Sequence, residues 1–146
     1  MKGTILHPTD FSPPSRSAFD RALALAREEG SELLLVHVLT TAMPMVGDGY
    51  MSPKTFDDLQ RSIRAQAQKQ LDRLLAKAKA SRVRVRGMLY EGVAADAIVR
   101  AARAKRTKLI VMGTHGRTGL ARLLMGSVAE RVIGTAPCPV LTVRGK

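Results

Sequence analysis

The chain has 146 residues with a formal net charge of +12; 45% of them are apolar, only 3% are aromatic, and tryptophan is absent. This length and apolar share exclude a disordered chain and favour one domain over residues 1–146, with a core of aliphatic side chains. No signal peptide is visible and no stretch approaches the roughly 20 apolar residues of a membrane span, so we expect a soluble, cytoplasmic protein.

The first third of the chain predicts two strands around a helix. Gly3–Pro8 is a short apolar strand, and the Ser12–Pro13 pair is typical of a helix start, with Gly30 at the helix end. The nearly continuous apolar run Glu32–Leu39 indicates a strand covered on both faces, as in a parallel sheet. A long loop is expected over Thr40–Ser52, which holds a proline and two glycines.

A long amphipathic helix is predicted next, because Ser52–Pro53 repeats the pattern of a capping residue before proline. Apolar residues then recur every three or four positions, and basic residues occupy the other faces. The apolar stripe consists of Phe56, Leu59, Ile63, Ala67, Leu71, Leu74 and Ala78. Valine and arginine alternate at the start of Val83–Tyr90, which favours an exposed edge strand.

The last third contains a helix after Gly92, an apolar strand over Lys108–Thr114, a short helix over Ser127–Ile133 and a final strand over Cys138–Val143. Alternation of this kind predicts an α/β fold, a doubly wound parallel sheet of five strands with about four helices and right-handed crossovers.

Ligands of such sheets bind beyond the carboxyl ends of the strands. Those ends carry His7–Asp10, His37–Leu39 and Met112–Gly116. We therefore expect these three segments, which are far apart in the sequence, to converge on one site.

The joint between the Lys108–Thr114 strand and the last helix is rich in glycine. Gly113 and Gly116 allow a ligand to approach the main chain, and the amides of Gly126–Val128 begin a helix without intrahelical partners. Such a helix start favours phosphate. The lysine of a Walker-type loop is absent, so the backbone amides would bind the phosphates in its place.

Three side chains near this joint have two interpretations each. Ser127 either caps the helix or donates its hydroxyl to a phosphate. Arg117 is either a phosphate ligand or a solvated loop charge, and His115 either approaches a phosphate or has a structural role in the loop.

The spacing Gly113-x2-Gly116-x9-Gly126-Ser127 is similar to the G-2x-G-9x-G-[ST] signature of the ATP-binding universal stress proteins. The segments ILHPTDFS, LLLVHVL, IVMGTHGRTGL, LLMGSVAERVI and PCPVLTVR also resemble that family, in the same order, so the resemblance covers the whole chain. It implies an adenine-nucleotide alpha hydrolase-like fold with strand order 3-2-1-4-5. It also implies a homodimer that pairs its last strands, here Val140–Val143.

The resemblance further implies a site for ATP or another adenine nucleotide, with Mg²⁺ or Mn²⁺ bridging the phosphates. Asp10 would bind the nucleoside, although capping of the turn that follows is an alternative role for it. Val38 would contact adenine through its backbone. The implied nucleotide-binding residues are Pro8, Thr9, Asp10, Val38, Met112, Gly113, His115, Gly116, Arg117, Gly126, Ser127 and Val128. No catalytic residue and no protein metal ligand are expected.

Three functions remain open at this point. The first is an ATP-binding stress-response or signalling module, and the second is a slow ATPase or phosphotransfer protein, although no clear general base lies near the phosphates. The third is a nucleic-acid or anion-binding protein that uses the basic segments 53–86 and 100–108, although stacking aromatics and a groove-reading motif are absent. We expect the first, a binding protein with at most slow ATPase activity.

Overall fold

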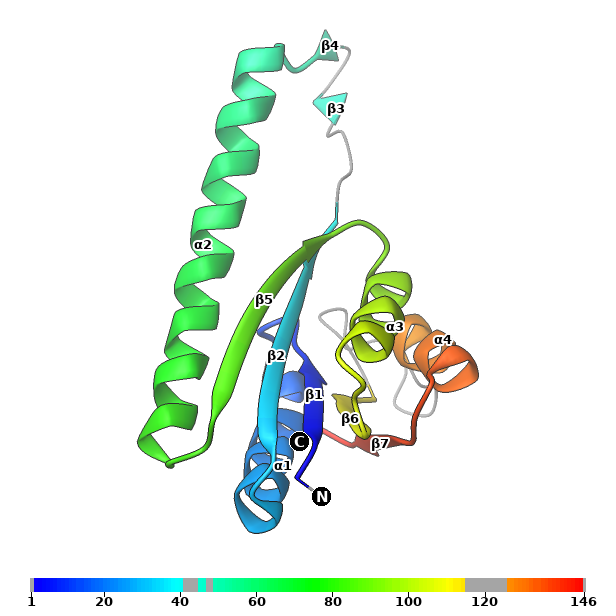
Figure 1. The fold of residues 1–146 in the computed structure, drawn as a ribbon. Coiled ribbons are helices and arrows are strands. Elements are labelled where there is room, and N and C mark those ends of the chain that lie inside the picture. Colours follow the sequence, from blue (N-terminus) through cyan, green and yellow to red (C-terminus); the bar gives the residue numbers. More distant parts are fainter. Residues whose placement is uncertain (1, 41–44, 47–48, 115–125, 146) are drawn as a thin grey trace.

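A computed structural model describes residues 2–40, 45–46, 49–114 and 126–145 of the chain. Within these residues, five strands form a parallel sheet and four helices flank it (Figure 1). The strands of this sheet are β1 (Thr4–Pro8), β2 (Glu32–Leu39), β5 (Val85–Glu91), β6 (Leu109–Gly113) and β7 (Val140–Val143). The helices are α1 (Pro13–Glu29), α2 (Pro53–Ala80), α3 (Ala94–Ala104) and α4 (Ser127–Thr135).

The order of the strands across the sheet is β5-β2-β1-β6-β7, and all four neighbouring pairs are parallel. When the five strands of this sheet are numbered 1 to 5 in chain order, the order across the sheet is 3-2-1-4-5, so the predicted fold is confirmed. β5 pairs only with β2 among the described residues, which makes it the edge strand that the alternating valines and arginines predicted.

The helix boundaries follow the capping residues of the sequence. Ser12 and Ser52 are the N-caps of α1 and α2, and each side-chain oxygen accepts a hydrogen bond from the amide three residues later. Gly30 ends α1 in the left-handed conformation, with φ of 65°, which a glycine adopts without a steric penalty.

The expectation of a loop throughout Thr40–Ser52 is wrong for two short segments. β3 (Met45–Val46) and β4 (Gly49–Tyr50) form an antiparallel pair in which Met45 lies opposite Tyr50. Strands of two residues are too short to produce a recognisable alternation of apolar and polar side chains, so the sequence pattern does not reveal them.

The core consists of two layers, one on each face of the sheet. Successive side chains along a strand point to opposite faces of the sheet. Ile5 and Leu33 therefore pack with α1 and α2, whereas Leu6 and Leu34 pack with α3 and α4. In Figure 1 these two pairs of helices lie on opposite faces of the sheet. Coverage on both faces explains why β2 is apolar at nearly every position.

Only part of the predicted apolar stripe of α2 is buried. Figure 1 shows that the N-terminal half of α2 runs past the end of the sheet. Ala67, Leu71 and Ala78 are buried, whereas Ile63 in the projecting half is 44% exposed. The stripe therefore does not face the core over the first three turns, because the sheet does not reach them.

We expect Leu71→Ala to lower the free energy of unfolding by about 2–5 kcal/mol, because it removes a fully buried side chain and leaves a cavity. Leu71 packs directly over Gly87 of β5, where an added Cβ would lie 3.1 Å from its side chain, so the contact is close. Urea unfolding measures the change. The matched variant Ile63→Ala should change the free energy by no more than about 0.5 kcal/mol; equal losses for the two variants would contradict this assignment of the core.

No helix in the described part of the chain is both long and apolar enough to cross a membrane.

Candidate functional site

The central strand β1 stops before its two neighbours do. Its pairing with β2 ends at Pro8, opposite Val36, and its pairing with β6 ends at Leu6, opposite Ile110. β2 and β6 continue beyond these positions, to Leu39 and Gly113. The sheet therefore has a notch at the carboxyl end of β1, where the strand order reverses and where ligands of doubly wound sheets bind.

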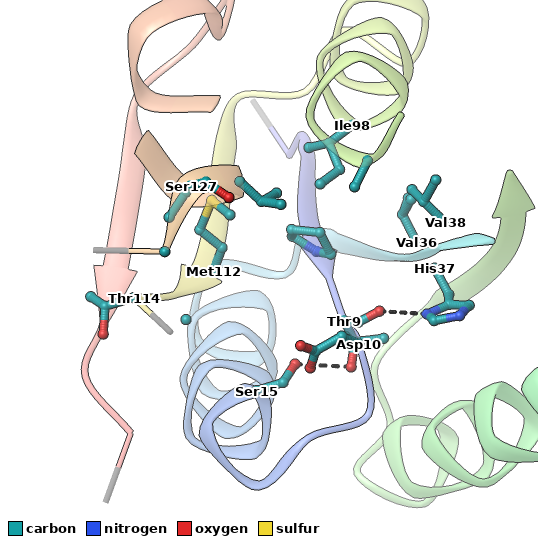
Figure 2. A pocket seen from close by; sticks show the side chains of 16 residues that line it. Thr9, Asp10, Ser15, Val36, His37, Val38, Ile98, Met112, Thr114 and Ser127 are labelled. Atoms are coloured by element: carbon teal, nitrogen blue, oxygen red, sulfur yellow. Dashed lines mark hydrogen bonds between the residues drawn. The ribbon is translucent and has the colours of Figure 1, made fainter. Parts of the chain in front are cut away.

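A cavity of about 300 Å³ occupies this notch (Figure 2). Its size is at the lower end of the range of about 300–1,000 Å³ that is typical of small-molecule sites. The walls come from the end of β1 and the turn that follows, from β2 and β6, and from the first turns of α1, α3 and α4. The three strand-end segments singled out in the sequence thus converge on one cavity.

Nine of the twelve implied binding residues line the cavity. They are Pro8, Thr9, Asp10, Val38, Met112, Gly113, Gly126, Ser127 and Val128. The other three, His115, Gly116 and Arg117, lie outside the described residues.

Seven further residues line the cavity. His37 and Thr114 belong to the strand-end segments that were expected to meet there, whereas five others were not assigned to the site from the sequence: Ser15, Val36, Ala94, Ile98 and Ala129. Of these, Ala94 and Ile98 are four positions apart and share one face of α3. Their residue types carry no binding signal, and only the crossover that places α3 over the notch reveals them.

Thr9 is held in place by hydrogen bonds on three sides. Its amide donates to the carbonyl of Val36 at 2.8 Å, and its own carbonyl accepts from Nδ1 of His37 at 2.7 Å. Its hydroxyl oxygen accepts from the amide of Phe11 at 3.0 Å and from the hydroxyl of Ser15 at 2.9 Å. This network connects the turn after β1, which lines the cavity, to both β2 and α1.

Phe11 occupies the left-handed region with φ of 63°, which is uncommon for a bulky residue. Its ring lies against the ring of His37, with the centroids 4.4 Å apart. The two contacts of His37, one to Thr9 and one to Phe11, brace the turn between β1 and α1.

Asp10 caps the turn that precedes α1, which is the alternative role considered for it. Its Oδ1 accepts hydrogen bonds from the amide and the hydroxyl of Ser12, at 3.0 and 2.5 Å. Asp10 also lines the cavity, as Figure 2 shows. Since a carboxylate has about four acceptor positions, capping and ligand binding are compatible.

The start of α4 is tied to the end of β6. The amide of Gly126 donates to the carbonyl of Thr114 at 2.6 Å, and the Gly126 carbonyl accepts the first helical hydrogen bond from Glu130. Gly126 is therefore the N-cap, and Ser127 is the first helical residue rather than the cap. The interpretation of Ser127 as a helix cap is wrong, because Gly126 takes that position.

This arrangement decides which amides remain for a ligand. The Gly126 amide is engaged with Thr114, whereas no hydrogen bond within the described residues occupies the amides of Ser127, Val128 and Ala129. All three residues line the cavity. The positive end of α4 thus contributes three donors that have no partner among the described residues, which suits an anionic group.

His7 joins β1 to β6 below the notch. Its buried ring donates from Nδ1 to the carbonyl of Val111 at 2.8 Å, one residue beyond the last residue of β6 that pairs with β1. Burial lowers the pKa of His7 to about 4, so the ring is neutral at physiological pH. The other ring nitrogen, Nε2, has no hydrogen-bond partner among the residues that the structure describes.

Comparison with known proteins identifies the family. The model of the Universal stress protein family matches residues 1–144. The chain belongs to the universal stress protein family. Universal stress protein MJ0531 of Methanocaldococcus jannaschii is 38% identical over 140 residues, which cover 96% of this chain and 81% of the relative. Universal stress protein YxiE of Bacillus subtilis is 31% identical over 148 residues, which cover 99% of this chain and 100% of the relative.

Solved structures of universal stress proteins share the fold. The structure of MJ0577 of Methanocaldococcus jannaschii superposes with a TM-score of 0.84 at 26% identity, and the match covers 100% of this chain and 98% of that one. A universal stress protein in complex with cAMP matches with a TM-score of 0.73 at 24% identity, over 99% and 98% of the two chains. One from Archaeoglobus fulgidus in complex with dAMP matches with a TM-score of 0.65 at 21% identity, over 97% of each chain.

Proposed function

We propose that this universal stress protein is a stress-response or signalling module that binds an adenine nucleotide in the cavity at the end of β1. The nucleotide proposed first is ATP. The observation that carries the proposal is the convergence of two groups on one cavity. Ser127–Ala129, whose amides have no partner in the described part of the chain, line one part of it, and Asp10 with its carboxylate lines another. Phosphate and ribose are the two parts of a nucleotide that such groups bind.

The cavity also offers an apolar surface for a base. In Figure 2, Ile98 lies between Ser127 on one side and Val38 on the other, and Met112 lies on the Ser127 side. In the proposed arrangement adenine lies against Val38 and Ile98, the ribose hydroxyls donate to Asp10, and the phosphates accept from Ser127–Ala129. Mg²⁺ or Mn²⁺ would enter with the phosphates and reduce their mutual repulsion.

The comparisons support the class of ligand. The two solved universal stress proteins in complex with cAMP and dAMP hold adenine nucleotides. The proposed binding mode holds the phosphates by backbone amides, and among the described lining residues the one carboxylate, Asp10, is assigned to the ribose, which favours binding over rapid hydrolysis.

Two further proposals accompany this one. The family model covers residues 1–144, which supports a single domain. β7 is the other edge of the sheet among the described residues, and its four residues are only partly buried in the single chain. Pairing of Val140–Val143 with the same strand of a second copy would satisfy this edge and form a homodimer.

Isothermal titration calorimetry with ATP and AMP, each with and without Mg²⁺, tests the proposed function. We expect saturable binding of at least one of the two at one site per chain. Tighter binding of ATP would show that the amides of α4 hold more than one phosphate, and equal binding would assign the affinity to the nucleoside and the first phosphate. Heats that equal those of dilution for both nucleotides would refute the proposal.

A further inference from the structure

A second cavity, of about 140 Å³, lies on the other side of the turn between β1 and α1. It opens to the surface and is bordered by this turn, by the first two turns of α1 and by the middle of α2. Phe11, Phe19 and Leu74 provide its apolar surface. The proposed nucleotide site does not use this cavity, and it is too small for a whole nucleotide.

The polar side of this second cavity is strongly basic. Arg16 from α1 and Arg73 from α2 both line it, together with the amide side chain of Gln70, and none of its lining residues is acidic. Five other basic side chains, Arg64, Lys77, Arg86, Lys108 and Arg131, have carboxylate partners. Arg16 and Arg73 form no ion pair within the described residues, so two arginines from different helices line one cavity whose described lining holds no counter-charge.

Two further charges lie close to this cavity. Lys77, one turn after Arg73 on α2, lies 5.5 Å from the centre of the ring of Phe19, which lines the cavity. Asp20, one turn after Arg16 on α1, is the partner of Lys77 at 3.4 Å, and neither residue lines the cavity. The charges of this pair offset each other, so Arg16 and Arg73 leave the lining of the cavity with a positive charge that an anion would balance.

We propose that this second cavity binds a phosphate group between the guanidinium groups of Arg16 and Arg73, with the amide of Gln70 as a further donor. Guanidinium groups present paired N–H donors that match the oxygens of a phosphate, and two of them balance its double negative charge. The volume of about 140 Å³ suits one phosphate group, either free or at the end of a larger molecule.

The two cavities share a wall. Thr9 and Ser15 line both of them, and the hydroxyl of Ser15 donates to that of Thr9 at 2.9 Å. A phosphate beside Arg16 would thus be separated from the nucleotide cavity by one pair of side chains. The phosphate site itself does not depend on the proposed nucleotide function, because none of its charged residues lines the nucleotide cavity.

Titration of the full-length, isotope-labelled chain with inorganic phosphate at constant ionic strength, followed by two-dimensional NMR, tests the proposal. We expect saturable shifts of the amides of Ser12, Ser15 and Gln70, and at least a tenfold weaker affinity in Arg73→Gln. Arg61→Gln removes the same charge from an exposed position on α2 outside the cavity and should bind phosphate as the wild type does. Both substituted side chains are exposed, and the unshifted remainder of each spectrum reports that the fold is intact.

The positions of the shifts separate this site from the nucleotide site. Phosphate bound at α4 would shift Ser127 and Val128, and those shifts should persist in Arg73→Gln. Absence of saturable shifts at Ser12 and Ser15 in the wild type, or equal affinity in Arg73→Gln and Arg61→Gln, would overturn the proposal. Glycerol 3-phosphate in place of inorganic phosphate identifies the source: tighter binding of the ester assigns the site to phosphorylated metabolites, and tighter binding of the inorganic ion assigns it to free phosphate.

Discussion

Lowering the pH from 7 to 5 should cost the protein about 2 kcal/mol of unfolding free energy through His7 alone. The pKa of this ring is about 4 in the folded chain, because the ring is fully buried, against an ordinary value of 6.5. Between these two values the unfolded chain binds a proton that the folded chain excludes. The contribution of neutral His7 is therefore complete above pH 6.5, declines as the pH falls, and is lost at about pH 4, where the total loss reaches about 3 kcal/mol.

Urea unfolding of the wild type and of His7→Asn at pH 7, 6 and 5 measures this effect. Asparagine cannot gain a proton, and its amide can still donate toward the carbonyl of Val111. The variant should be less stable at pH 7, since it fills the site less well, but its stability should change less with pH. Parallel profiles for the two proteins would show that the pH dependence arises elsewhere.

Gly126→Val should weaken binding of the adenine nucleotide at least tenfold. Gly126 lines the cavity at the start of α4, so a β-branched side chain at this position adds bulk beside the amides proposed to hold the phosphates. The backbone there has φ of −59° and ψ of 149°, a conformation that valine adopts readily. The variant should therefore fold normally and lose affinity for a local reason.

Calorimetry with the nucleotide that binds the wild type best is the measurement, with thermal unfolding as a check of the fold. Gly134→Val is the matched control, because Gly134 is an exposed residue of α4 with open space around an added Cβ. It should bind as the wild type does. If Gly126→Val retained full affinity, the phosphates would have to lie away from the start of α4.

Local chemistry explains why most of the fold could be predicted. The caps at Ser12 and Ser52 and the helix end at Gly30 depend only on neighbouring residues, so the sequence reveals them directly. The apolar stripe of α2 shows which side of that helix is apolar, but it does not reveal how far the sheet extends beneath it. That limit is why the exposure of Ile63, which belongs to the stripe, does not follow from the sequence pattern.

The candidate site was predictable where it follows from topology. The rule that ligands bind at the carboxyl ends of strands places Thr9, Val38 and Met112 at one site from the sequence alone. It could not identify Ile98, whose place at the cavity depends on the crossover of α3. Nor could it show that the amide of Gly126 is already engaged, since its partner Thr114 is twelve positions earlier in the chain.

That last bond bears on how the cavity tolerates substitution. Thr114 and Gly126 are joined at 2.6 Å between main-chain atoms, so the end of β6 and the start of α4 are held together without the help of a side chain. A change of side chain at either position, other than to proline at Gly126, therefore leaves this bond in place. The backbone sets the position of the two cavity walls, and the chemistry of their surface can change through side chains such as Thr114 and Ser127.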